Sequence, residues 1–308
     1  MMTHAKTPAI VRTIAELRQR IKAYRRAASA EATVGFVPTM GYLHGGHASL
    51  LRRSVHENGL TVLSIFVNPL QFGPNEDLAR YPRDEERDVT LAASNGVDIV
   101  FLPSVEEMYP VYPLLTTVSV SSVSEHLCGA SRPGHFDGVA TVVAKLFNIV
   151  QPDRAYFGLK DAQQVAVIAQ MAADLSIPVE IVPCPIVREQ DGLALSSRNV
   201  YLSAGEREQS LALSRSLAKA ERWVAAGATA QELAKKLAED IRQAPSADID
   251  YVEIVTYPGM QPIIGSGALR EYADSVLIAL AVRFGRTRLI DNLIVKPKEA
   301  GDLLCSAK

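Results

Sequence analysis

Short apolar segments alternate with stretches of helical periodicity through the first part of the chain, and this alternation is the strongest constraint on the fold. The apolar segments are rich in β-branched residues, as buried strands are, and cover residues 33–37, 60–67, 97–102, 154–158 and 179–187. Helical spacing occupies residues 10–24, 48–57, 139–150 and 163–175. Strands and helices that alternate in this way form a parallel sheet covered by helices. We therefore predict an α/β domain with a doubly wound parallel sheet.

The pattern changes after about residue 185. Ser203 is a good N-cap residue before a long helix with an apolar face, which Gly227 ends, and a second helix covers residues 230–241. Strands are expected at residues 251–256, 276–284 and 287–295, with a turn at Gly285 and Arg286 between the last two. The predicted domains are residues 1–185 and a smaller α+β domain at residues 186–308.

Charge and hydropathy exclude several classes of protein. The 308 residues include 32 Lys and Arg and 34 Asp and Glu, a net charge of −2 that disfavours a nucleic-acid binder. Apolar runs such as residues 276–282 are far shorter than the ~18 residues that cross a membrane. The N-terminus has no secretory signal pattern, so we expect a cytoplasmic protein that binds neither nucleic acid nor membrane.

The three cysteines, Cys128, Cys184 and Cys305, are widely spaced and form no metal-binding motif. We predict no disulfide, no structural zinc and no catalytic cysteine. Cys184 lies in an apolar run, where a small buried side chain is expected.

The residues after the first strand are the main candidates for a functional site, because ligands of parallel sheets bind at the carboxyl ends of the strands. There His44-Gly45-Gly46-His47 opens a helix, whose free N–H groups and dipole favour an anion. We predict a phosphate site flanked by two imidazoles. A solvated pair and a metal site are the alternatives, although zinc hydrolases space their histidines at i and i+4 rather than i and i+3. A P-loop motif is missing, and Gly265-x-Gly267 lacks the third glycine of a dinucleotide fingerprint.

Polar residues follow other strands as well. Asn68 and Gln71 flank a proline turn, where an Asx hydrogen bond is the simpler interpretation. Lys160-Asp161 is either a surface ion pair or the source of an ammonium for a phosphate, and Gln164 follows on the next helix.

The loop after the last strand of the sheet carries Ser196, Ser197 and Arg198, which suit a triphosphate, and Asp191-Gly192 is expected to be a flexible turn that lets the loop close. A capped turn before the Ser203 helix is the alternative. His135 is expected to hold its loop, and residues 83–88 to form a solvated first helical turn.

Together these segments resemble the pantothenate synthetases, or pantoate–β-alanine ligases, of the HIGH-type nucleotidylyltransferase superfamily. His44–His47 looks like the HxGH signature, and Leu195–Arg198 looks like the mobile KMSKS-type loop. The similarity continues in register through residues 66–72, 81–83, 158–164 and 282–292.

The resemblance implies a Rossmann-like N-terminal domain, a smaller C-terminal lid domain and a homodimer. The implied reaction joins (R)-pantoate and β-alanine with cleavage of ATP to AMP and pyrophosphate, through a pantoyl adenylate. The implied catalytic residues are His44, His47, Lys160 and Arg198, with His47 as proton donor. The implied ATP site comprises Met40, Gly41, His44, His47, Gly158, Leu159, Lys160, Asp161, Val187, Leu195, Ser196, Ser197 and Arg198. Gln71 and Gln164 would hold pantoate, and Gln71 would also meet β-alanine.

Magnesium is expected with ATP, because it neutralises the leaving pyrophosphate. Asp88 aligns approximately with a position near the metal in the family, but Arg87 precedes it, so the metal ligands stay unassigned. The chain also departs from the family at Gly45, Leu159, Ala162 and Leu195, and none of these departures removes a group that the chemistry needs.

Two other functions compete with this one. A nucleotidylyltransferase that keeps the nucleotide in its product predicts basic residues for a phosphorylated acceptor, whereas Asn68, Gln71 and Gln164 are neutral. A non-catalytic module that binds nucleotide or tRNA fits poorly with the net charge of −2.

Overall fold

The structure is a computed structural model that describes residues 7–28, 32–74, 76 and 78–296. The chain divides into two compact units. Unit 1 consists of the described residues of Met1–Val120, Arg132–Leu159 and Val167–Val187, and unit 2 of those of Ser121–Ser131, Lys160–Ala166 and Arg188–Lys308. The last crossing between the units follows Val187, close to the predicted boundary. The two short earlier segments of unit 2 were assigned to the first domain, because no change in the sequence pattern marks them.

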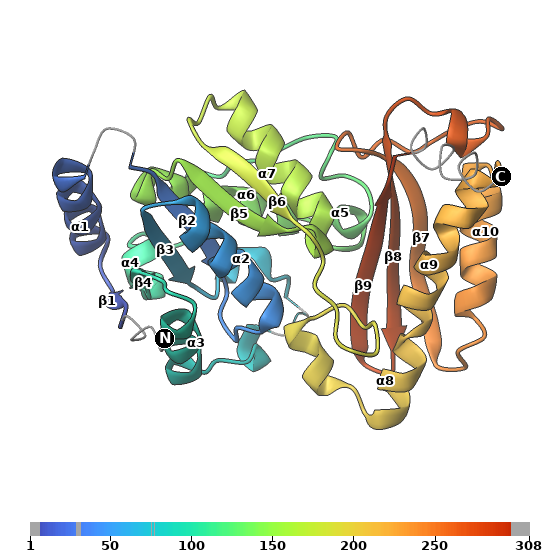
Figure 1. Ribbon diagram of the computed structural model, residues 1–308, viewed down its shortest axis with the longest axis horizontal. Coiled ribbons are helices and arrows are strands. Elements are labelled where there is room, and N and C mark those ends of the chain that lie inside the picture. Colours follow the sequence, from blue (N-terminus) through green and yellow to red (C-terminus); the bar gives the residue numbers. More distant parts are fainter. Residues whose placement is uncertain (1–6, 29–31, 75, 77, 297–308) are drawn as a thin grey trace. The chain divides into compact units, whose positions relative to one another are not determined.

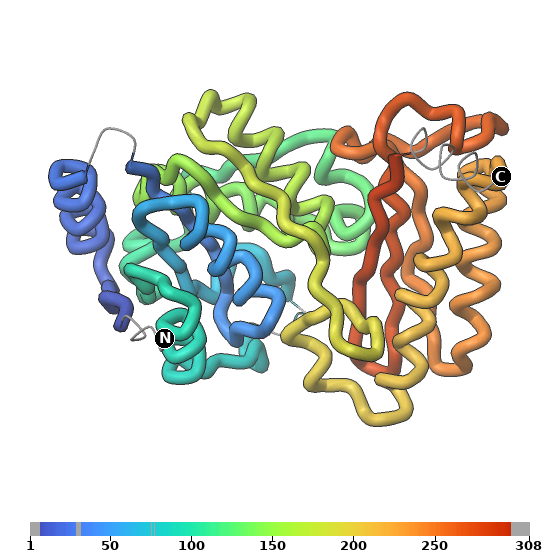
Figure 2. Tube along the Cα trace, in the orientation of Figure 1, coloured from blue at the N-terminus to red at the C-terminus, as the bar shows by residue number. Residues whose placement is uncertain are grey.

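Unit 1 is built around a six-stranded sheet in the order β1-β4-β3-β2-β5-β6, and every neighbouring pair is parallel (Figures 1 and 2). The strands are β1 (Ala9–Val11), β2 (Val34–Thr39), β3 (Leu60–Ile65), β4 (Ile99–Phe101), β5 (Arg154–Gly158) and β6 (Glu180–Cys184). This sheet confirms the predicted fold class, and Cys184 is buried in it as expected.

The order of the strands reverses between β2 and β5. The chain runs outward from β2 to β3 and β4 on one side, and β5 and β6 lie on the other side of β2. In doubly wound sheets such a reversal opens a crevice at the carboxyl ends of the two adjacent strands, where ligands bind. The turn that follows β2 therefore lies where a ligand is expected.

Helices cover this sheet. They are α1 (Ile14–Ala27), α2 (Gly45–Glu57), α3 (Glu85–Ser94), α4 (Val105–Met108), α6 (His135–Val150) and residues 167–174 of α7 (Ala162–Asp174), with the single turns η1 (Pro69–Gln71) and η2 (Leu78–Arg80). Helix α2 packs on β2, β3 and β5, and α6 packs on β2 and α1. The side chains of Phe36, Leu63 and Tyr156 are completely buried in this core.

Two helix starts differ from the sequence-based expectation. Ile10 and Val11 were placed in a helix but belong to β1, because the hydroxyl of Thr13 accepts the N–H of Glu16 and begins α1 only after an extended residue. The spacing of apolar residues is compatible with both assignments. Helix α6 begins at His135 rather than at residue 139, because Gly134 takes a positive φ of 78° as its N-cap.

Unit 2 contains an antiparallel sheet in the order β7-β8-β9, formed by β7 (Ala247–Tyr257), β8 (Ser275–Phe284) and β9 (Thr287–Val295). Helix α9 (Ala212–Ala225) contacts β9, and α10 (Ala230–Ile241) contacts both β7 and α9 (Figure 1). Its other helical segments are α5 (Cys128–Ser131), residues 162–166 of α7, α8 (Ala204–Ser210), η3 (Leu159–Asp161, from Lys160 onward), η4 (Ser197–Tyr201) and η5 (Leu269–Glu271). The predicted α+β character of the second domain is confirmed.

The single long helix expected from Ser203 to Gly227 is instead two helices, α8 and α9, which meet at Leu211. Ser203 does cap α8, in a capping box with Glu206, and Gly227 follows α9 with a φ of 91°. The spacing of apolar residues does not distinguish one helix from two helices that only Leu211 separates.

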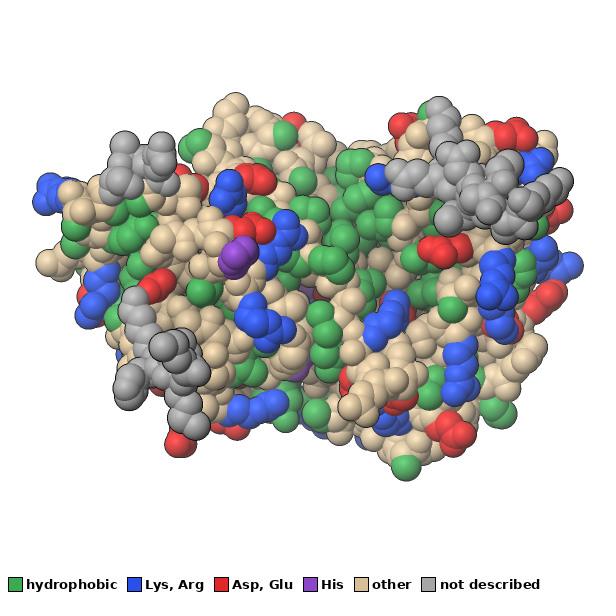
Figure 3. Space-filling view, in the orientation of Figure 1, with side chains coloured by type: hydrophobic (Ala, Val, Ile, Leu, Met, Phe, Trp, Pro, Cys, Tyr) green, Lys and Arg blue, Asp and Glu red, His purple; other side chains and the backbone are tan. Residues whose placement is uncertain are grey.

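The distribution of surface charge and the character of the helices match the charge and hydropathy of the sequence. Side chains of both charges are interspersed on the face in Figure 3. Among the described residues, no helix combines the length and the apolar character that crossing a membrane requires. Cys305 lies outside the described residues, while Cys128 and Cys184 are free thiols.

Candidate active site

The turn between β2 and α2 places His44 and His47 together at the N-terminus of the helix. His44 is the N-cap, and its Nδ1 accepts the N–H of Gly46 at 3.1 Å. The Nδ1 of His47 accepts the N–H of His44 at 3.3 Å. Each histidine thus satisfies a backbone donor that the first turn of a helix otherwise leaves unpaired. The predicted location of both imidazoles at a helix N-terminus is confirmed.

These two hydrogen bonds determine where the imidazole protons lie. A backbone N–H only donates, so neither Nδ1 carries a hydrogen, and each neutral ring holds its proton on Nε2. The ring centroids are 4.1 Å apart, with the ring planes 38° from parallel. The site therefore has two neighbouring Nε2–H donors at the positive end of a helix dipole, which is an arrangement that favours a phosphate.

Asp88, on α3, holds the turn before these histidines. The side chain is 1% exposed; Oδ1 accepts the N–H of Leu43 at 2.6 Å and Oδ2 accepts the N–H of Tyr42 at 2.8 Å. The prediction of a solvated helical turn at residues 83–88 is wrong for this residue, because Asp88 lies on the face of α3 that is turned to the core. Burial raises the pKa of Asp88, and its hydrogen bonds from the backbone oppose the shift without cancelling it.

Gly41 is required by the same turn. Its φ is +85°, and a Cβ there would lie 2.9 Å from Cγ2 of Ile65 and 3.0 Å from Oδ2 of Asp88. A side chain at this position would therefore be strained and would push against the carboxylate that orders the turn.

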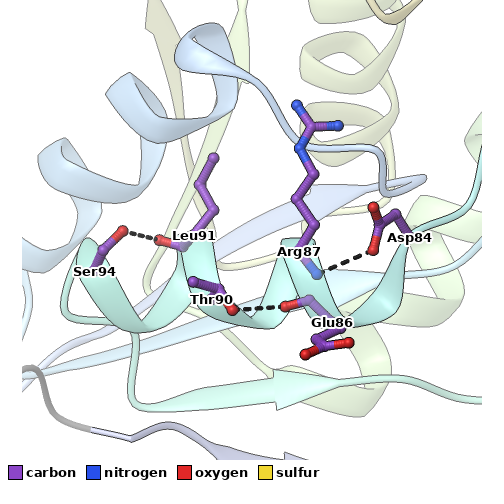
Figure 4. A pocket seen from close by; sticks show the side chains of 6 residues that line it. All are labelled: Asp84, Glu86, Arg87, Thr90, Leu91 and Ser94. Carbon is purple, nitrogen blue, oxygen red and sulfur yellow. Dashed lines mark hydrogen bonds between the residues drawn. The ribbon is translucent and has the colours of Figure 1, made fainter.

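The outer face of α3 bears a shallow hollow, lined by Asp84, Glu86, Arg87, Thr90, Leu91 and Ser94 (Figure 4). Three of its polar side chains bond to the helix itself: Asp84 accepts the N–H of Arg87, Thr90 donates to the carbonyl of Glu86, and Ser94 donates to that of Leu91. The guanidinium of Arg87 lies 4.7 Å from the centre of the Tyr42 ring. These contacts stabilise α3 and its packing, and we assign the hollow no ligand.

Gln71, at the end of η1, is held by its backbone carbonyl. Nδ1 of His135 donates to that oxygen at 2.8 Å, and Arg132 donates to it at 3.3 Å. Glu76 forms a 2.5 Å ion pair with Arg132. His135 therefore orders this turn, in agreement with the expectation that it holds a loop.

The side chain of Gln71 is held by Asn68, which caps η1. Oδ1 of Asn68 accepts the N–H of Leu70, so the Asx turn is present, and Nδ2 donates to Oε1 of Gln71 at 3.2 Å. Tyr109 and Gly138 complete this network, and sequence reasoning gave neither of them a role. A buried tyrosine beside a short helix and a glycine early in an apolar helix were the signals available.

The remaining candidate residues of unit 1 adjoin strand ends. Gly158 is the last residue of β5 and Leu159 follows it, while Val187 follows β6 by three residues. All three are half-buried. A Cβ at Gly158 would meet nothing within 4 Å, so the backbone there is open to an approaching group.

In unit 2, consecutive residues of β9 anchor two candidate segments. Nδ2 of Asn292 donates to the carbonyl of Lys160 at 2.9 Å. Asp291, 2% exposed, accepts two hydrogen bonds from the guanidinium of Arg188, at 2.7 and 3.0 Å. Asp161 is exposed and Gln164 is half-buried on α7. No role was predicted for Asp291 or Asn292, although two polar residues inside an apolar strand are a recognisable signal.

Ion pairs and hydrogen bonds hold the turn at Asp191 and Gly192 in this structure. Arg207 pairs with Glu189 and with Asp191, each at 2.7 Å. Asn199 donates to Glu189 at 2.8 Å and to the carbonyl of Ala194 at 3.1 Å. The sequence shows Gly192 but not the Arg207 that pairs with residues on both sides of the turn, and the flexibility of this turn stays a prediction.

Ser196 caps the η4 turn, because its hydroxyl accepts the N–H of Arg198 at 3.3 Å. The capped turn that was the alternative interpretation of this loop is therefore present. A hydroxyl that accepts a hydrogen bond still has its own hydrogen to donate, so the capped turn and a phosphate contact are compatible. Leu195, Ser197 and Arg198 are half-buried.

A sequence model of the family described as Pantoate-beta-alanine ligase matches residues 9–294, nearly the whole chain. This chain belongs to the pantoate–β-alanine ligase family. It is 55% identical over 288 residues to the pantothenate synthetase of Caldicellulosiruptor saccharolyticus, an alignment that covers 93% of this chain and 99% of that protein.

Solved structures of the ligase family have the same fold. The pantothenate synthetase of Thermus thermophilus is 48% identical with a TM-score of 0.83, and the match covers 92% of this chain and 98% of that one. The pantoate–β-alanine ligase of Francisella tularensis, solved in complex with β,γ-ATP and β-alanine, is 34% identical with a TM-score of 0.74 and coverage of 94% and 100%.

Side-chain contacts join some of the candidate ligase residues within each unit. Within unit 1, the β2–α2 turn and Gln71 are in contact, because Nε2 of Gln71 lies 3.1 Å from Sδ of Met40. Within unit 2, β9 links the Lys160 segment to Arg188, from which the loop with Ser196, Ser197 and Arg198 starts.

Proposed function

We propose that this chain condenses (R)-pantoate with β-alanine to give pantothenate, with cleavage of ATP to AMP and pyrophosphate. The observation that carries the proposal is the pair of Nε2–H donors of His44 and His47 at the N-terminus of α2, directly after a central strand of the sheet. Membership of the pantoate–β-alanine ligase family supports the same reaction.

In the first step, the carboxylate of pantoate attacks the α-phosphorus of ATP, and pyrophosphate leaves. Negative charge gathers on the phosphate oxygens in this transition state, so positioned donors and cations are the main source of catalysis. His44 and His47 supply N–H donors, and Lys160 and Arg198 supply positive charge. His47 is the proposed proton donor to the leaving group.

In the second step, the amine of β-alanine attacks the carbonyl carbon of the pantoyl adenylate, and AMP leaves as the amide forms. An acyl adenylate hydrolyses if water reaches it, so the site must exclude solvent while the amine attacks. We assign this shielding to the loop of residues 196–199. Gln71 meets the incoming β-alanine.

The substrates divide the remaining residues between them. Gln71 and Gln164 hold pantoate through its hydroxyls and carboxylate. The nucleotide lies against backbone and side chains of Met40, Gly41, Gly158, Leu159, Asp161, Val187, Leu195, Ser196 and Ser197. The substitutions in this chain relative to the family, at Leu159 and Leu195, are compatible with binding through the backbone.

Magnesium is the metal that we propose to accompany ATP. Among residues 7–28, 32–74, 76 and 78–296, no group of three His, Cys, Asp or Glu side chains is placed to hold a metal ion. Asp88 fits poorly as a ligand, because its side chain is buried and each of its oxygens already accepts a backbone N–H of the turn. Mg²⁺ fits instead as a partner of the ATP phosphates with water in its remaining positions. When bound, it would neutralise charge on the pyrophosphate.

The enzyme is further proposed to be a cytoplasmic homodimer that binds neither nucleic acid nor membrane. The net charge of −2 and the interspersed surface charges support a protein whose partners are small molecules.

Product analysis tests the proposed reaction. Purified protein with ATP, pantoate, β-alanine and Mg²⁺ should form pantothenate, AMP and pyrophosphate, and a chelator should stop it. Formation of ADP, or turnover that does not need pantoate, would contradict the ligase. A product that retains the nucleotide would support the nucleotidylyltransferase alternative.

Lys160→Ala tests the charge at the phosphate. We expect pantoate-dependent pyrophosphate release to fall by about 10²–10³-fold, the size of effect that loss of one transition-state contact has in other enzymes. Lys235→Ala is the matched control, because the Lys235 side chain is 78% exposed on α10. Equal activity of both variants would make Lys160 an ordinary surface charge.

A further inference from the structure

Tyr109, Asn68 and Gln71 form a continuous chain of hydrogen bonds within unit 1. We propose that Tyr109 is a positioning residue that acts through Asn68 to hold the carboxamide of Gln71 with its N–H side turned toward substrate. This inference rests on the proposed function, because Gln71 is the residue assigned to pantoate. It specifies which atom of the ligand Gln71 meets: an oxygen that accepts a hydrogen bond.

Two backbone groups determine which way the Asn68 amide points. Oδ1 faces the N–H of Leu70 at 3.3 Å, and Nδ2 faces the carbonyl of Gly138 at 3.1 Å. Rotating the amide by 180° would place a donor against the Leu70 donor and an acceptor against the Gly138 acceptor. Because a backbone N–H only donates and a carbonyl only accepts, the orientation of Asn68 is unambiguous.

Tyr109 makes the shortest hydrogen bond in this network. Its hydroxyl donates to Oδ1 of Asn68 at 2.7 Å, whereas the Leu70 N–H is 3.3 Å from the same oxygen. The Tyr109 ring is 3% exposed and packs edge-on against Phe66, with centroids 5.8 Å apart. Burial raises the pKa of Tyr109, so the hydroxyl keeps the proton that it donates.

Asn68 in turn orients the carboxamide of Gln71. Nδ2 of Asn68 donates to Oε1 of Gln71 at 3.2 Å, so the other side of the carboxamide, Nε2, lies against Sδ of Met40 at 3.1 Å. A thioether is a weak acceptor. A carboxylate or hydroxyl oxygen would therefore replace it readily, and pantoate has both. With its backbone carbonyl held by Arg132 and His135, Gln71 is an ordered donor rather than a mobile one.

Tyr109→Phe removes the hydroxyl and keeps the ring that packs on Phe66. We expect the KM for pantoate to rise about three- to tenfold, as for one lost hydrogen bond between neutral groups, with the KM for ATP unchanged. Tyr156→Phe is the matched control: Tyr156 is also buried in unit 1, but its hydroxyl bonds to Glu57 and Asn58 at the C-terminal end of α2. That control should leave the KM for pantoate as in wild type.

A double-mutant cycle separates positioning from a general structural role. Once Asn68→Ala has cut the chain, adding Tyr109→Phe should raise the KM for pantoate no further, because the hydroxyl no longer acts on Gln71. If wild-type turnover requires pantoate, additive effects in the cycle or an unchanged KM for pantoate in Tyr109→Phe would overturn the inference alone. Wild-type turnover that does not require pantoate would overturn the proposed function and the inference together. Circular dichroism and melting temperatures confirm that each variant is folded.

Discussion

At the scale of single residues, the candidate site is defined by which side-chain atoms already accept hydrogen bonds from the backbone. His44 and His47 give Nδ1 to N–H groups of the first turn of α2, and this leaves Nε2–H as the donor of each ring. Asp88 gives both oxygens to the turn before them. The imidazole donors of the two histidines are thus set by backbone contacts, whereas both carboxylate oxygens of Asp88 bond to the turn itself.

Asp88→Asn should lower kcat/KM for ATP about 5- to 100-fold. An amide has only one oxygen, so one of the buried N–H donors of Tyr42 and Leu43 would face an NH₂ group, and an unpaired buried donor costs about 1–3 kcal/mol. Asp84→Asn is the matched control, because Asn caps a helix as well as Asp does and Asp84 caps α3. Steady-state kinetics with varied ATP make the comparison, and equal values for the two variants would show that Asp88 does not order the turn.

The raised pKa of Asp88 also predicts that the stabilities of the wild type and of Asp88→Asn depend differently on pH. The pKa of Asp88 is raised in the folded protein above its unfolded value of about 3.9, so the folded state binds more protons just above that pH. The stability of the wild type therefore falls as pH rises through the window between the two values. Asp88→Asn lacks this titration, so its melting temperature should improve relative to wild type as pH rises from about 4 toward neutral. A difference that stays constant with pH would contradict the prediction.

At the scale of elements, the close approach of α6 to η1 places Gln71. A Cβ on Gly138 would collide with the carbonyl of Leu70 and would lie 2.7 Å from the nitrogen of Gln71. Glycine at this position is what lets the helix backbone accept a hydrogen bond from Asn68. Strand β9 has a comparable role in unit 2, since Asp291 and Asn292 hold the Arg188 and Lys160 segments.

Gly138→Ala should destabilise the protein by about 1–3 kcal/mol, the usual cost of overpacking, and should raise the KM for pantoate as η1 shifts. Gly205→Ala, in α8, is the opposite case, because a Cβ there meets nothing within 4 Å and its φ is not positive. That variant should gain about 0.5–1 kcal/mol from helix propensity alone. Thermal unfolding of the two variants measures both effects, and a stable, fully active Gly138→Ala would rule out the close approach.

At the scale of the whole molecule, each unit builds its own core and carries its own group of candidate residues. The unit 1 group has the histidines and Gln71, and the unit 2 group has Lys160, Gln164 and Arg198. The chemistry we propose needs residues from both groups. The unit assignment of Lys160 is not visible in the sequence, because Lys160 lies between a strand and a helix that the sequence pattern assigns to one α/β domain.

The proposed homodimer predicts a particle of twice the mass of one chain. Sedimentation velocity at micromolar concentration should give a single dimeric species. A monomer that is fully active would contradict the dimer and leave the proposed reaction unaffected.

Features that depend on neighbours along the chain could be predicted from the amino-acid sequence. Apolar runs of strand length, helical periodicity and a glycine turn before His44–His47 predicted the parallel sheet and two imidazoles at a helix N-terminus. These features follow from local geometry, because side-chain period and helix capping involve residues only a few positions apart.

Features that join distant residues became visible only in the folded chain. Asp88 lies on a polar helical turn yet is buried, because the N–H groups of Tyr42 and Leu43, more than forty positions earlier, face its carboxylate. The amide orientation of Gln71 depends on Gly138, 70 residues beyond the Asn68 that transmits it. Periodicity records which face of a helix is apolar, whereas a buried hydrogen bond depends on the exact approach of two elements that the sequence separates.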